Sequence, residues 1–324
     1  MHNWDVWHEN APFSKYKEYH PRFCSEFGFQ SFPSMEVAEM FASKEQILSR
    51  GPDFEWHQKG NGGNERIRKT LDRYFPRPKD VPSELLLSQF QQAMAIQTAV
   101  DAWRGEQPRC MGTLFWQLND NWPVASWSAI EYGGKWKPLQ YLAKRFFAPV
   151  RVTLAPDGMV KVVNDTDKTY VGAVRAVFFP FDGGKMEIVD IGRLRSPPGS
   201  AVAAGSIAQR TDAALELLFL YSHEDSQMGF DASNFPVRAD YKGDLPKAHV
   251  KAEVNGFKVT LTTDKPAFWT WMDVKGIRGE FDDNAVTLVP GIPRTFVFTP
   301  YDKTTSPQAF KAALSVTHLA DLCK

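Results

Sequence analysis

Cysteine, net charge and long apolar runs are all scarce in this chain of 324 residues. Its three cysteines, Cys24, Cys110 and Cys323, are too scattered for a disulfide framework, and no CxxC or cysteine–histidine metal spacing occurs. Basic and acidic residues number 38 each, so the charge gives no sign of a nucleic-acid or membrane-surface partner. No apolar run approaches the roughly 20 residues that span a bilayer. The sequence therefore predicts no metal, no cofactor, no nucleic acid and no membrane as a partner.

A signal peptide is also missing from the start of the chain. Residues 1–7 contain no basic region and are rich in aromatic side chains, which is typical of sequence inside a domain. We therefore expect the chain to be a piece of a longer protein. The compartment stays open: it would be periplasmic, secreted or lysosomal if the full-length parent carries a signal peptide.

Aromatic residues, in contrast, are abundant, with 10 Trp and 24 Phe. Most aromatic rings belong to a core, because they bury large apolar areas. Tryptophan is also the side chain that stacks best against the apolar face of a sugar. The position of each ring in the chain must therefore decide between the two roles.

The first 150 residues alternate strand-like and helix-like stretches. Residues 22–29 and 110–116 read as short buried strands, and Asn64 is expected to cap a short helix. Further helices are expected at residues 35–41 (capped by Ser34), 83–103 (opened by Ser83) and 138–147. This rhythm is typical of a parallel sheet, but only two or three units are present and a (β/α)8 barrel needs eight. We therefore predict that residues 1–150 form the C-terminal part of a TIM-barrel catalytic domain.

After residue 150 the helical spacing disappears. Strand runs follow at residues 160–164, 171–178, 215–221, 250–254 and 257–261, separated by Gly, Pro, Asp and Asn. The pattern predicts two Ig-like β-sandwiches, over residues 151–240 and 241–324, with the polar stretch 238–244 as their linker. The predicted fold class is thus α/β plus all-β.

The first candidate catalytic residue is Glu26, which lies toward the C-terminal end of the strand predicted at residues 22–29. A carboxylate at the C-terminal end of a barrel strand lies on the face where barrel active sites assemble. Phe23 and Phe27 are expected to make its surroundings partly apolar, and Arg22 to offset its charge. The competing interpretation is an ordinary surface or ion-pair carboxylate.

Two further segments combine aromatic and polar side chains. In residues 112–123 a strand delivers Trp116, a dense polar run with Asn119 and Asp120, and then Trp122. A stacking ring beside hydrogen-bonding groups suits a sugar, although a core tryptophan followed by a turn has the same pattern. The segment 2–8, with Trp4, is open to the same two interpretations.

Taken together, these segments resemble the β-mannosidases of glycoside hydrolase family 2. Residues 23–34, Phe-Cys-Ser-Glu-Phe-Gly-Phe-Gln-Ser-Phe-Pro-Ser, are similar to the nucleophile strand of that group. Residues 116–123, Trp-Gln-Leu-Asn-Asp-Asn-Trp-Pro, continuing through 126–128 to 144–149, are similar to its eighth strand and closing helix. The resemblance is strong over residues 1–150 and weaker beyond. Because Ser-Glu-Phe-Gly strings occur across family 2, a β-galactosidase or β-glucuronidase specificity remains an alternative.

The resemblance implies a retaining β-mannosidase that removes terminal non-reducing β-D-mannose from β-mannosides and oligosaccharides. Glu26 would be the nucleophile, which attacks the anomeric carbon and gives a covalent glycosyl-enzyme. Trp116 would be the platform under the sugar, with Trp4 as a side wall. Asn119 and Asp120 would bond sugar hydroxyls or brace their loop, and Trp122 would also bind substrate.

The acid/base carboxylate of that mechanism has no match in this chain. Glu9 and Glu18 read as loop residues, and the pair Asn64-Glu65 follows the nucleophile at a helix start instead of preceding it on a strand. We therefore expect the chain to be inactive alone and to act with the missing N-terminal part of the same protein.

A non-catalytic carbohydrate-binding or structural module is the alternative from a different class. Trp269 and Trp271 are spaced to lie on one face of a strand, as a sugar platform requires. The same spacing is equally typical of a sandwich core.

Overall fold

The computed structural model describes the backbone of residues 1–180, 185–208, 216–224, 227–236 and 240–324. Side chains are described for these residues except 179, 180, 216–224 and 227–236. The chain forms two compact units, each built from three segments. Unit 1 comprises residues 1–29, 92–117 and 142–240, and unit 2 comprises residues 30–91, 118–141 and 241–324.

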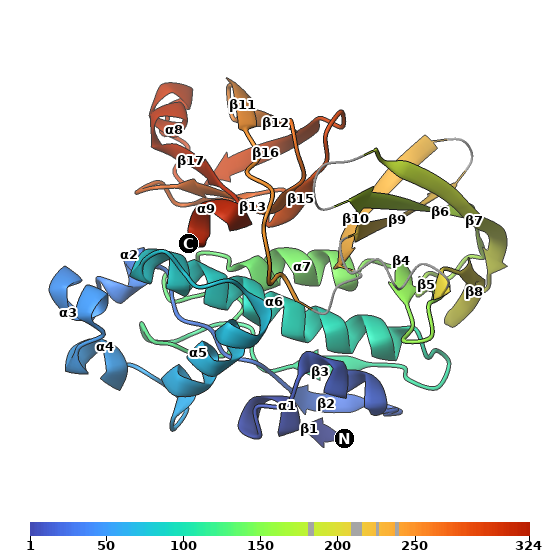
Figure 1. Ribbon diagram of the computed structural model, residues 1–324, viewed down its shortest axis with the longest axis horizontal. Coiled ribbons are helices and arrows are strands. Elements are labelled where there is room, and N and C mark those ends of the chain that lie inside the picture. Colours follow the sequence, from blue (N-terminus) through green and yellow to red (C-terminus); the bar gives the residue numbers. More distant parts are fainter. Residues whose placement is uncertain (181–184, 209–215, 225–226, 237–239) are drawn as a thin grey trace. The chain divides into compact units, whose positions relative to one another are not determined.

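A small parallel sheet lies at the N-terminal end of unit 1. Its strands are β1 (His2–Asn3), β2 (Cys24–Phe27) and β3 (Thr113–Phe115), in the order β1-β2-β3 and all parallel (Figure 1). Helix α1 (Asp5–His8) and the 3-10 helix η1 (Phe13–Glu18) follow β1. The ring of Phe27 is fully buried and packs edge-on against Tyr16 and Trp103. The expected strands and their parallel pairing are thus confirmed, as a sheet of three strands.

Residues 35–74 of unit 2 form four helices, and their N-terminal caps differ in part from the prediction. The helices are α2 (Met35–Ala38), α3 (Lys44–Ser49), α4 (Pro52–Trp56) and α5 (Gly63–Tyr74). The Ser34 hydroxyl accepts a hydrogen bond from the Val37 amide, so the predicted cap of α2 is confirmed. Asn64, however, does not cap α5: the cap is Gly62, whose φ of 67° suits glycine, and Asn64 is the second residue of the helix.

Two longer helices contribute residues to both units. Helix α6 spans Val81–Arg104, and helix α7 spans Pro138–Phe146. The predicted opening of α6 at Ser83 was two residues late, because the Asp80 carboxylate accepts a hydrogen bond from the Ser83 amide (2.9 Å) and caps the helix. Helix α7 lies where the sequence predicts it.

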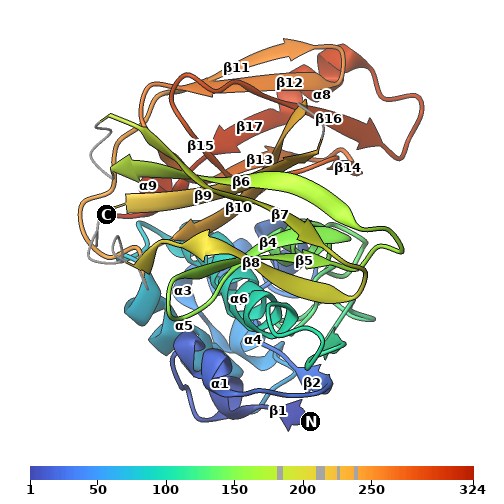
Figure 2. The same cartoon turned by 90° about the vertical axis from the view of Figure 1, so that its right-hand side faces the viewer.

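The rest of unit 1 is an antiparallel sandwich. One sheet has the order β4-β5-β8, and the other has the order β10-β9-β6-β7 (Figure 2). The strands are β4 (Val150–Leu154), β5 (Met159–Asn164), β6 (Tyr170–Pro180), β7 (Glu187–Ser196), β8 (Ser200–Ser206), β9 (Glu216–Glu224) and β10 (Gln227–Pro236). Alternate apolar residues such as Val160, Val162, Val174 and Phe178 meet in its core. The predicted strand at 215–221 falls on β9, except for residue 215, which lies outside the described residues.

Residues 250–322 of unit 2 form a second arrangement, with two antiparallel sheets. One sheet has the order β11-β12-β16-β14 and the other the order β15-β13-β17. Its elements are β11 (Val250–Asn255), β12 (Lys258–Thr263), β13 (Ala267–Val274), β14 (Gly279–Phe281), β15 (Val286–Leu288), β16 (Arg294–Pro300), α8 (Pro307–Ala313), β17 (Leu314–Thr317) and α9 (Leu319–Leu322). The rings of Phe281, Phe298 and Phe310 pack together in its core.

The two tryptophans of β13 belong to this core. Trp269 and Trp271 are 3% and 7% exposed. The register shifts between Ala267 and Thr270, and the two rings face different partners: Trp269 stacks on Phe90 (5.0 Å), and Trp271 meets Tyr141 edge-on (5.8 Å). Their burial favours the core interpretation over a sugar platform.

The predicted linker 238–244 is only partly described. Residues 238 and 239 lie outside the described residues. Tyr241 is fully buried, and its amide donates a hydrogen bond to the Tyr74 carbonyl (2.7 Å). At that residue the chain is packed into unit 2. Within the described part of the chain, no helix has the length and apolar character needed to cross a bilayer.

Candidate active site

Glu26 lies on the central strand of the parallel sheet in unit 1. It stands opposite His2 in the register of β1 and β2, one residue before the buried Phe27. Its side chain is 36% exposed, so the carboxylate is open to solvent on one side and contacts protein on the other. In β2 the first and last residues, Cys24 and Phe27, are buried, and Glu26 between them is partly exposed.

Two side chains from the N-terminal segment face one oxygen of Glu26. The indole Nε1 of Trp4 donates a hydrogen bond to Oε2 (3.3 Å), and Nδ1 of His2 lies 3.5 Å from the same atom. Among the described residues, no hydrogen bond reaches Oε1. The carboxylate is therefore anchored through one oxygen and presents the other.

The surroundings expected from the immediate neighbours of Glu26 were wrong in two respects. Arg22 is exposed and forms no ion pair with Glu26 among the described residues; the groups next to the carboxylate are the Trp4 indole N–H and the His2 ring instead. Phe23 is 45% exposed, and its ring lies against Gly112, where a Cβ atom would come within 2.3 Å of it. Phe27 is buried, with its ring packed against Tyr16 and Trp103.

Trp116 belongs to the same sheet as Glu26. Its amide donates a hydrogen bond to the carbonyl of Phe27 (2.7 Å), and the indole is 47% exposed directly after β3. The peptide bond between Trp116 and Gln117 is cis. Unit 1 thus brings together three of the predicted site residues: Glu26, Trp4 and Trp116.

The other three predicted residues belong to a loop of unit 2. Asp120 is buried: its Oδ1 accepts from Nζ of Lys59 (2.7 Å) and its Oδ2 from Oγ of Ser126 (2.6 Å). Asn119 is exposed and forms an isolated bridge with Ile130. Trp122 is half-buried against the His57 ring (5.3 Å). Of the two roles predicted for Asp120, these contacts match that of bracing the loop.

Sequence reasoning missed some of these contributors. His2 was noted only as part of an aromatic cluster, and the strand register needed to bring it to Glu26 has no sequence signature. Lys59 stands in a glycine-rich polar stretch 61 positions from Asp120. A lone lysine in such a stretch carries no signal of its own.

Two buried charged residues, Glu131 and Lys137, lie in unit 2 shortly after this loop in the sequence. Glu131 accepts hydrogen bonds from the amide and hydroxyl of Ser34 (2.8 and 2.6 Å), and Nζ of Lys137 donates to Oγ of Ser31 (3.1 Å). Burial raises the pKa of Glu131, against a smaller opposite effect of the Lys137 charge. Burial likewise lowers the pKa of Lys137, against the charges of Asp120 and Glu131.

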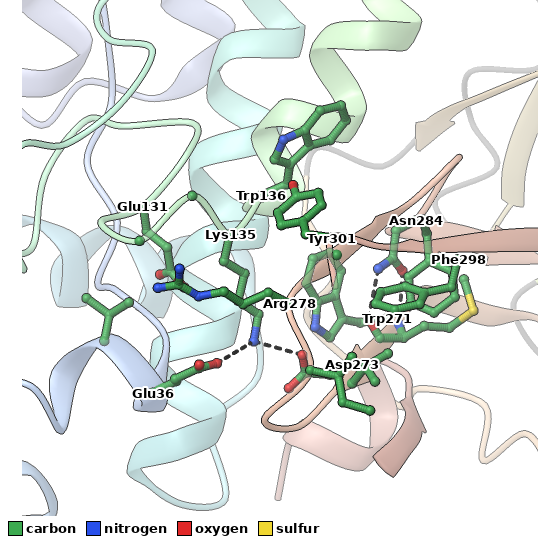
Figure 3. Close-up of a pocket in the computed structure, with 18 of the residues that line it drawn as sticks. Glu36, Glu131, Lys135, Trp136, Trp271, Asp273, Arg278, Asn284, Phe298 and Tyr301 are labelled. Carbon is green, nitrogen blue, oxygen red and sulfur yellow. Dashed lines mark hydrogen bonds and ion pairs between the residues drawn. The ribbon is translucent and has the colours of Figure 1, made fainter. Parts of the chain in front are cut away.

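Unit 2 also contains a hollow lined by aromatic and charged side chains (Figure 3). Trp136, Trp271 and Tyr301 contribute rings to it. Nζ of Lys135 lies 2.8 Å from Asp273 and 3.5 Å from Glu36, which ties β13 to α2. None of the six predicted site residues, all of which the structure describes, lines this hollow. The part of the chain that the structure describes holds no cluster of three or more His, Cys, Asp or Glu side chains suited to a metal.

The fold and the site together define a class. A mixed α/β part carries a partly exposed carboxylate beside the half-buried indole of Trp4 and the exposed indole of Trp116, and antiparallel β-sheet domains follow it along the chain. Carboxylates at strand ends are typical of the active sites of barrel enzymes.

Comparisons with known proteins identify the relatives within that class. Residues 243–322 match a family model described as Ig-fold domain, Ig_mannosidase. The chain is 31% identical to the beta-mannosidase of Capra hircus over 93% of its length and 34% identical to beta-mannosidase B of Aspergillus niger over 92%. The crystal structure of the beta-D-mannosidase from Dictyoglomus thermophilum covers the whole chain with a TM-score of 0.82 and 28% identity. The predicted resemblance is confirmed: the chain is homologous to β-mannosidases and matches their C-terminal part.

The chain covers less than half the length of each of these relatives. The chain spans 37% of the goat enzyme, 39% of the fungal enzyme and 40% of the chain in the bacterial structure. An exo-chitosanase of Amycolatopsis orientalis, 15% identical with a TM-score of 0.71, shares the fold.

Proposed function

We propose that this chain is the C-terminal part of a retaining β-mannosidase, in which it completes a (β/α)8 barrel and supplies the nucleophile Glu26. The observation that carries the proposal is the anchoring of the Glu26 carboxylate, through Oε2 only, by Trp4 and His2. A nucleophilic carboxylate must be ionised and must direct one oxygen at the anomeric carbon. The Trp4 N–H on Oε2 supports the second requirement, because it fixes the carboxylate and leaves Oε1 to point at the substrate.

The reaction would proceed by two displacements at the anomeric carbon. Oε1 of Glu26 attacks C1, the bond from C1 to the glycosidic oxygen breaks, and a covalent mannosyl-enzyme forms. An acid protonates the departing oxygen, and its conjugate base then takes a proton from the water that attacks C1, which breaks the bond from C1 to Oε1 and returns Glu26 as a carboxylate. Because each displacement inverts C1, the product retains the β configuration.

The acid/base belongs, in this proposal, to a part of the protein upstream of the chain. Glu18 forms an exposed ion pair with Lys15 (2.6 Å), and Glu65 forms one with Lys69 on the surface of α5 (2.7 Å). Glu9 is exposed at the end of α1. A retaining enzyme needs its second carboxyl about 5–5.5 Å from the first, and the surface pairs of Glu18 and Glu65 give no support to such a role.

The sugar contacts follow from the exposed rings. Trp116 would form the platform under the mannose, and Trp4 a side wall that also holds Glu26. Asn119 and Trp122 would meet the substrate from a loop that Asp120, Lys59 and Ser126 keep in shape. The substrate class, a terminal β-mannoside or its oligosaccharides, is inferred from the relatives.

A covalent trap tests the proposal on the full-length protein that contains this segment. A 2-deoxy-2-fluoro-β-mannosyl fluoride should inactivate the enzyme and add one fluorosugar to the peptide that carries Glu26, as read by mass spectrometry. Glu26→Gln should fold normally and remain unlabelled. Labelling of a different carboxylate would refute the assignment of Glu26. Faster labelling by a gluco- or galacto-configured reagent would refute only the mannose specificity.

A further inference from the structure

A short aromatic strip lies on the surface of unit 2, outside the residues assigned above except for Trp122. We define it as Trp56, His57 and Trp122. Trp56, at the end of α4, is 75% exposed, and the His57 ring lies 5.5 Å from it and 5.3 Å from the Trp122 ring. On its other side, His57 stacks on Phe41 at 4.1 Å with the two planes almost parallel. The strip thus continues from the predicted substrate residue Trp122 to a ring that solvent almost surrounds.

Backbone pairing holds the strip in place. The amide of Ala125 donates to the His57 carbonyl (2.9 Å), and the Lys59 amide donates to the Ala125 carbonyl (3.1 Å). Nδ1 of His57 lies 2.9 Å from the carbonyl oxygen of Pro123 and fixes the plane of the imidazole. The segment that carries Trp56 is therefore locked to the loop that carries Trp122. A ligand would meet a backbone segment and a His57 ring that are already positioned, which lowers the entropy lost on binding.

The groups that border the strip are polar. Nζ of Lys59 pairs with Asp120 beside it, and Asn121, next to Trp122 in the loop, is exposed. An indole has an apolar face with an N–H at its edge, and the neighbouring amide both donates and accepts hydrogen bonds. A pyranose has the matching surface, an apolar C–H face rimmed by hydroxyl groups. Protein-sized partners, in contrast, need about 800 Å² of surface on each side.

We infer that the aromatic strip, with Asn121, binds sugar units of a β-linked mannooligosaccharide. Trp56 is the stacking platform for one such unit, and His57 and Trp122 extend the aromatic surface beside it. The choice of mannose rests on the proposed function. The choice of a neutral, chain-like glycan rests on the strip itself.

Calorimetric titration of the whole 324-residue chain tests this inference with β-1,4-mannotetraose, with mannose and with cellotetraose as probes. Trp56→Ala should weaken mannotetraose binding about tenfold, as loss of a stacked ring does, and should leave mannose binding unchanged. Trp56→Phe should restore part of the affinity, because a ring returns. Tyr301→Ala removes a different exposed ring of unit 2, 51% exposed, and should bind as the parent chain does. Circular dichroism and the thermal midpoint establish that each variant is folded.

Three results would overturn the inference: no saturable binding of any tetrasaccharide by the parent chain, unchanged affinity in Trp56→Ala, or an equal loss in Tyr301→Ala. Tighter binding of cellotetraose than of mannotetraose, with the same dependence on Trp56, would support the strip as a glycan site and overturn the mannose specificity. A failed covalent trap at Glu26 with intact binding at Trp56 would refute the catalytic proposal alone.

Discussion

Trp4 donates its indole N–H to Oε2 of Glu26 across 3.3 Å, although 22 residues separate them along the chain. The parallel pairing of β1 with β2 produces this contact, because it sets His2 opposite Glu26 and Asn3 opposite Phe27. The N-terminal segment is thus part of the candidate active site. Its contribution can be measured in the full-length enzyme.

Trp4→Phe should lower turnover of an aryl β-mannoside by about tenfold or more. A hydrogen bond to a charged group contributes about 1.5–3 kcal/mol, and phenylalanine keeps the ring but removes the donor. The expected loss is in kcat, because the bond orients the attacking carboxylate. Steady-state kinetics of the full-length variant give the value.

Tyr19→Phe serves as the matched control. Tyr19 donates its hydroxyl to Asp5 in the same unit and does not touch Glu26 among the described contacts, so turnover should stay within about twofold of the parent. Equal losses in the two variants would mean that Trp4 acts through folding instead of through Glu26.

A buried ion pair in unit 1 predicts a large stability effect. The guanidinium of Arg151 on β4 forms two hydrogen bonds with Asp101 on α6, at 2.9 and 2.8 Å, and both residues are less than 5% exposed. Removing one partner of a buried pair leaves an uncompensated charge and costs about 3–5 kcal/mol. Arg151→Met should therefore lower the free energy of unfolding by about that amount, as measured by urea denaturation.

The double variant Asp101→Leu/Arg151→Met should recover much of this loss, because no buried charge then remains. Arg175→Met is the exposed counterpart: Arg175 pairs with Asp190, whose side chain is 77% exposed, and such pairs contribute about 0–1 kcal/mol. A loss in Arg175→Met as large as in Arg151→Met would contradict the role of burial.

Local patterns predicted the elements of this site better than they predicted its contacts. The runs around Glu26 and Trp116 read as strands because they are short, apolar and bounded by turns, and both lie in the parallel sheet. The donors to Glu26 depend on strand register, which the two-residue β1 has no pattern to specify. From the sequence we therefore expected Arg22, the nearest cation along the chain, to lie beside the Glu26 carboxylate. In the fold, His2 and Trp4 take that place.

The cap of helix α5 also depends on contacts that the local sequence does not reveal. Asn64 is a good capping residue, yet Gly62, two residues earlier, adopts the left-handed conformation and caps α5. Asn64 instead accepts a hydrogen bond from Gln58 and donates one to Glu55. These tertiary partners outweigh the intrinsic preference of asparagine for the cap position.

Thiol reactivity should follow burial. Burial raises the pKa of Cys24 to about 11, with a smaller opposing effect of its hydrogen bond to the Glu26 carbonyl, and burial also raises that of Cys110. At mildly alkaline pH both should resist iodoacetamide in the folded chain and react fully in urea. Burial raises the pKa of Cys323 to about 11 as well, so its advantage is access alone: its side chain is half-buried where the other two are buried, and it should react first. Peptide mass spectrometry resolves the three sites, and rapid modification of folded Cys24 would refute the prediction.

The buried charges of Glu131 and Lys137 predict how the stability of a Lys137 variant changes with pH. Burial already holds the pKa of Glu131 above its ordinary 4.5, and the Lys137 charge limits that rise, so Lys137→Met should raise it further. A carboxyl that binds its proton more tightly when folded stabilises the fold below pH 4.5, and this stability is lost as the pH rises through the folded pKa. The urea midpoint of Lys137→Met should therefore fall below that of the parent chain progressively from pH 4.5 toward neutrality.

Lys311→Met, which removes an exposed lysine of α8, is the control and should have the same urea midpoint as the parent at every pH. A constant offset between Lys137→Met and the parent would show that Lys137 acts by packing instead of by its charge.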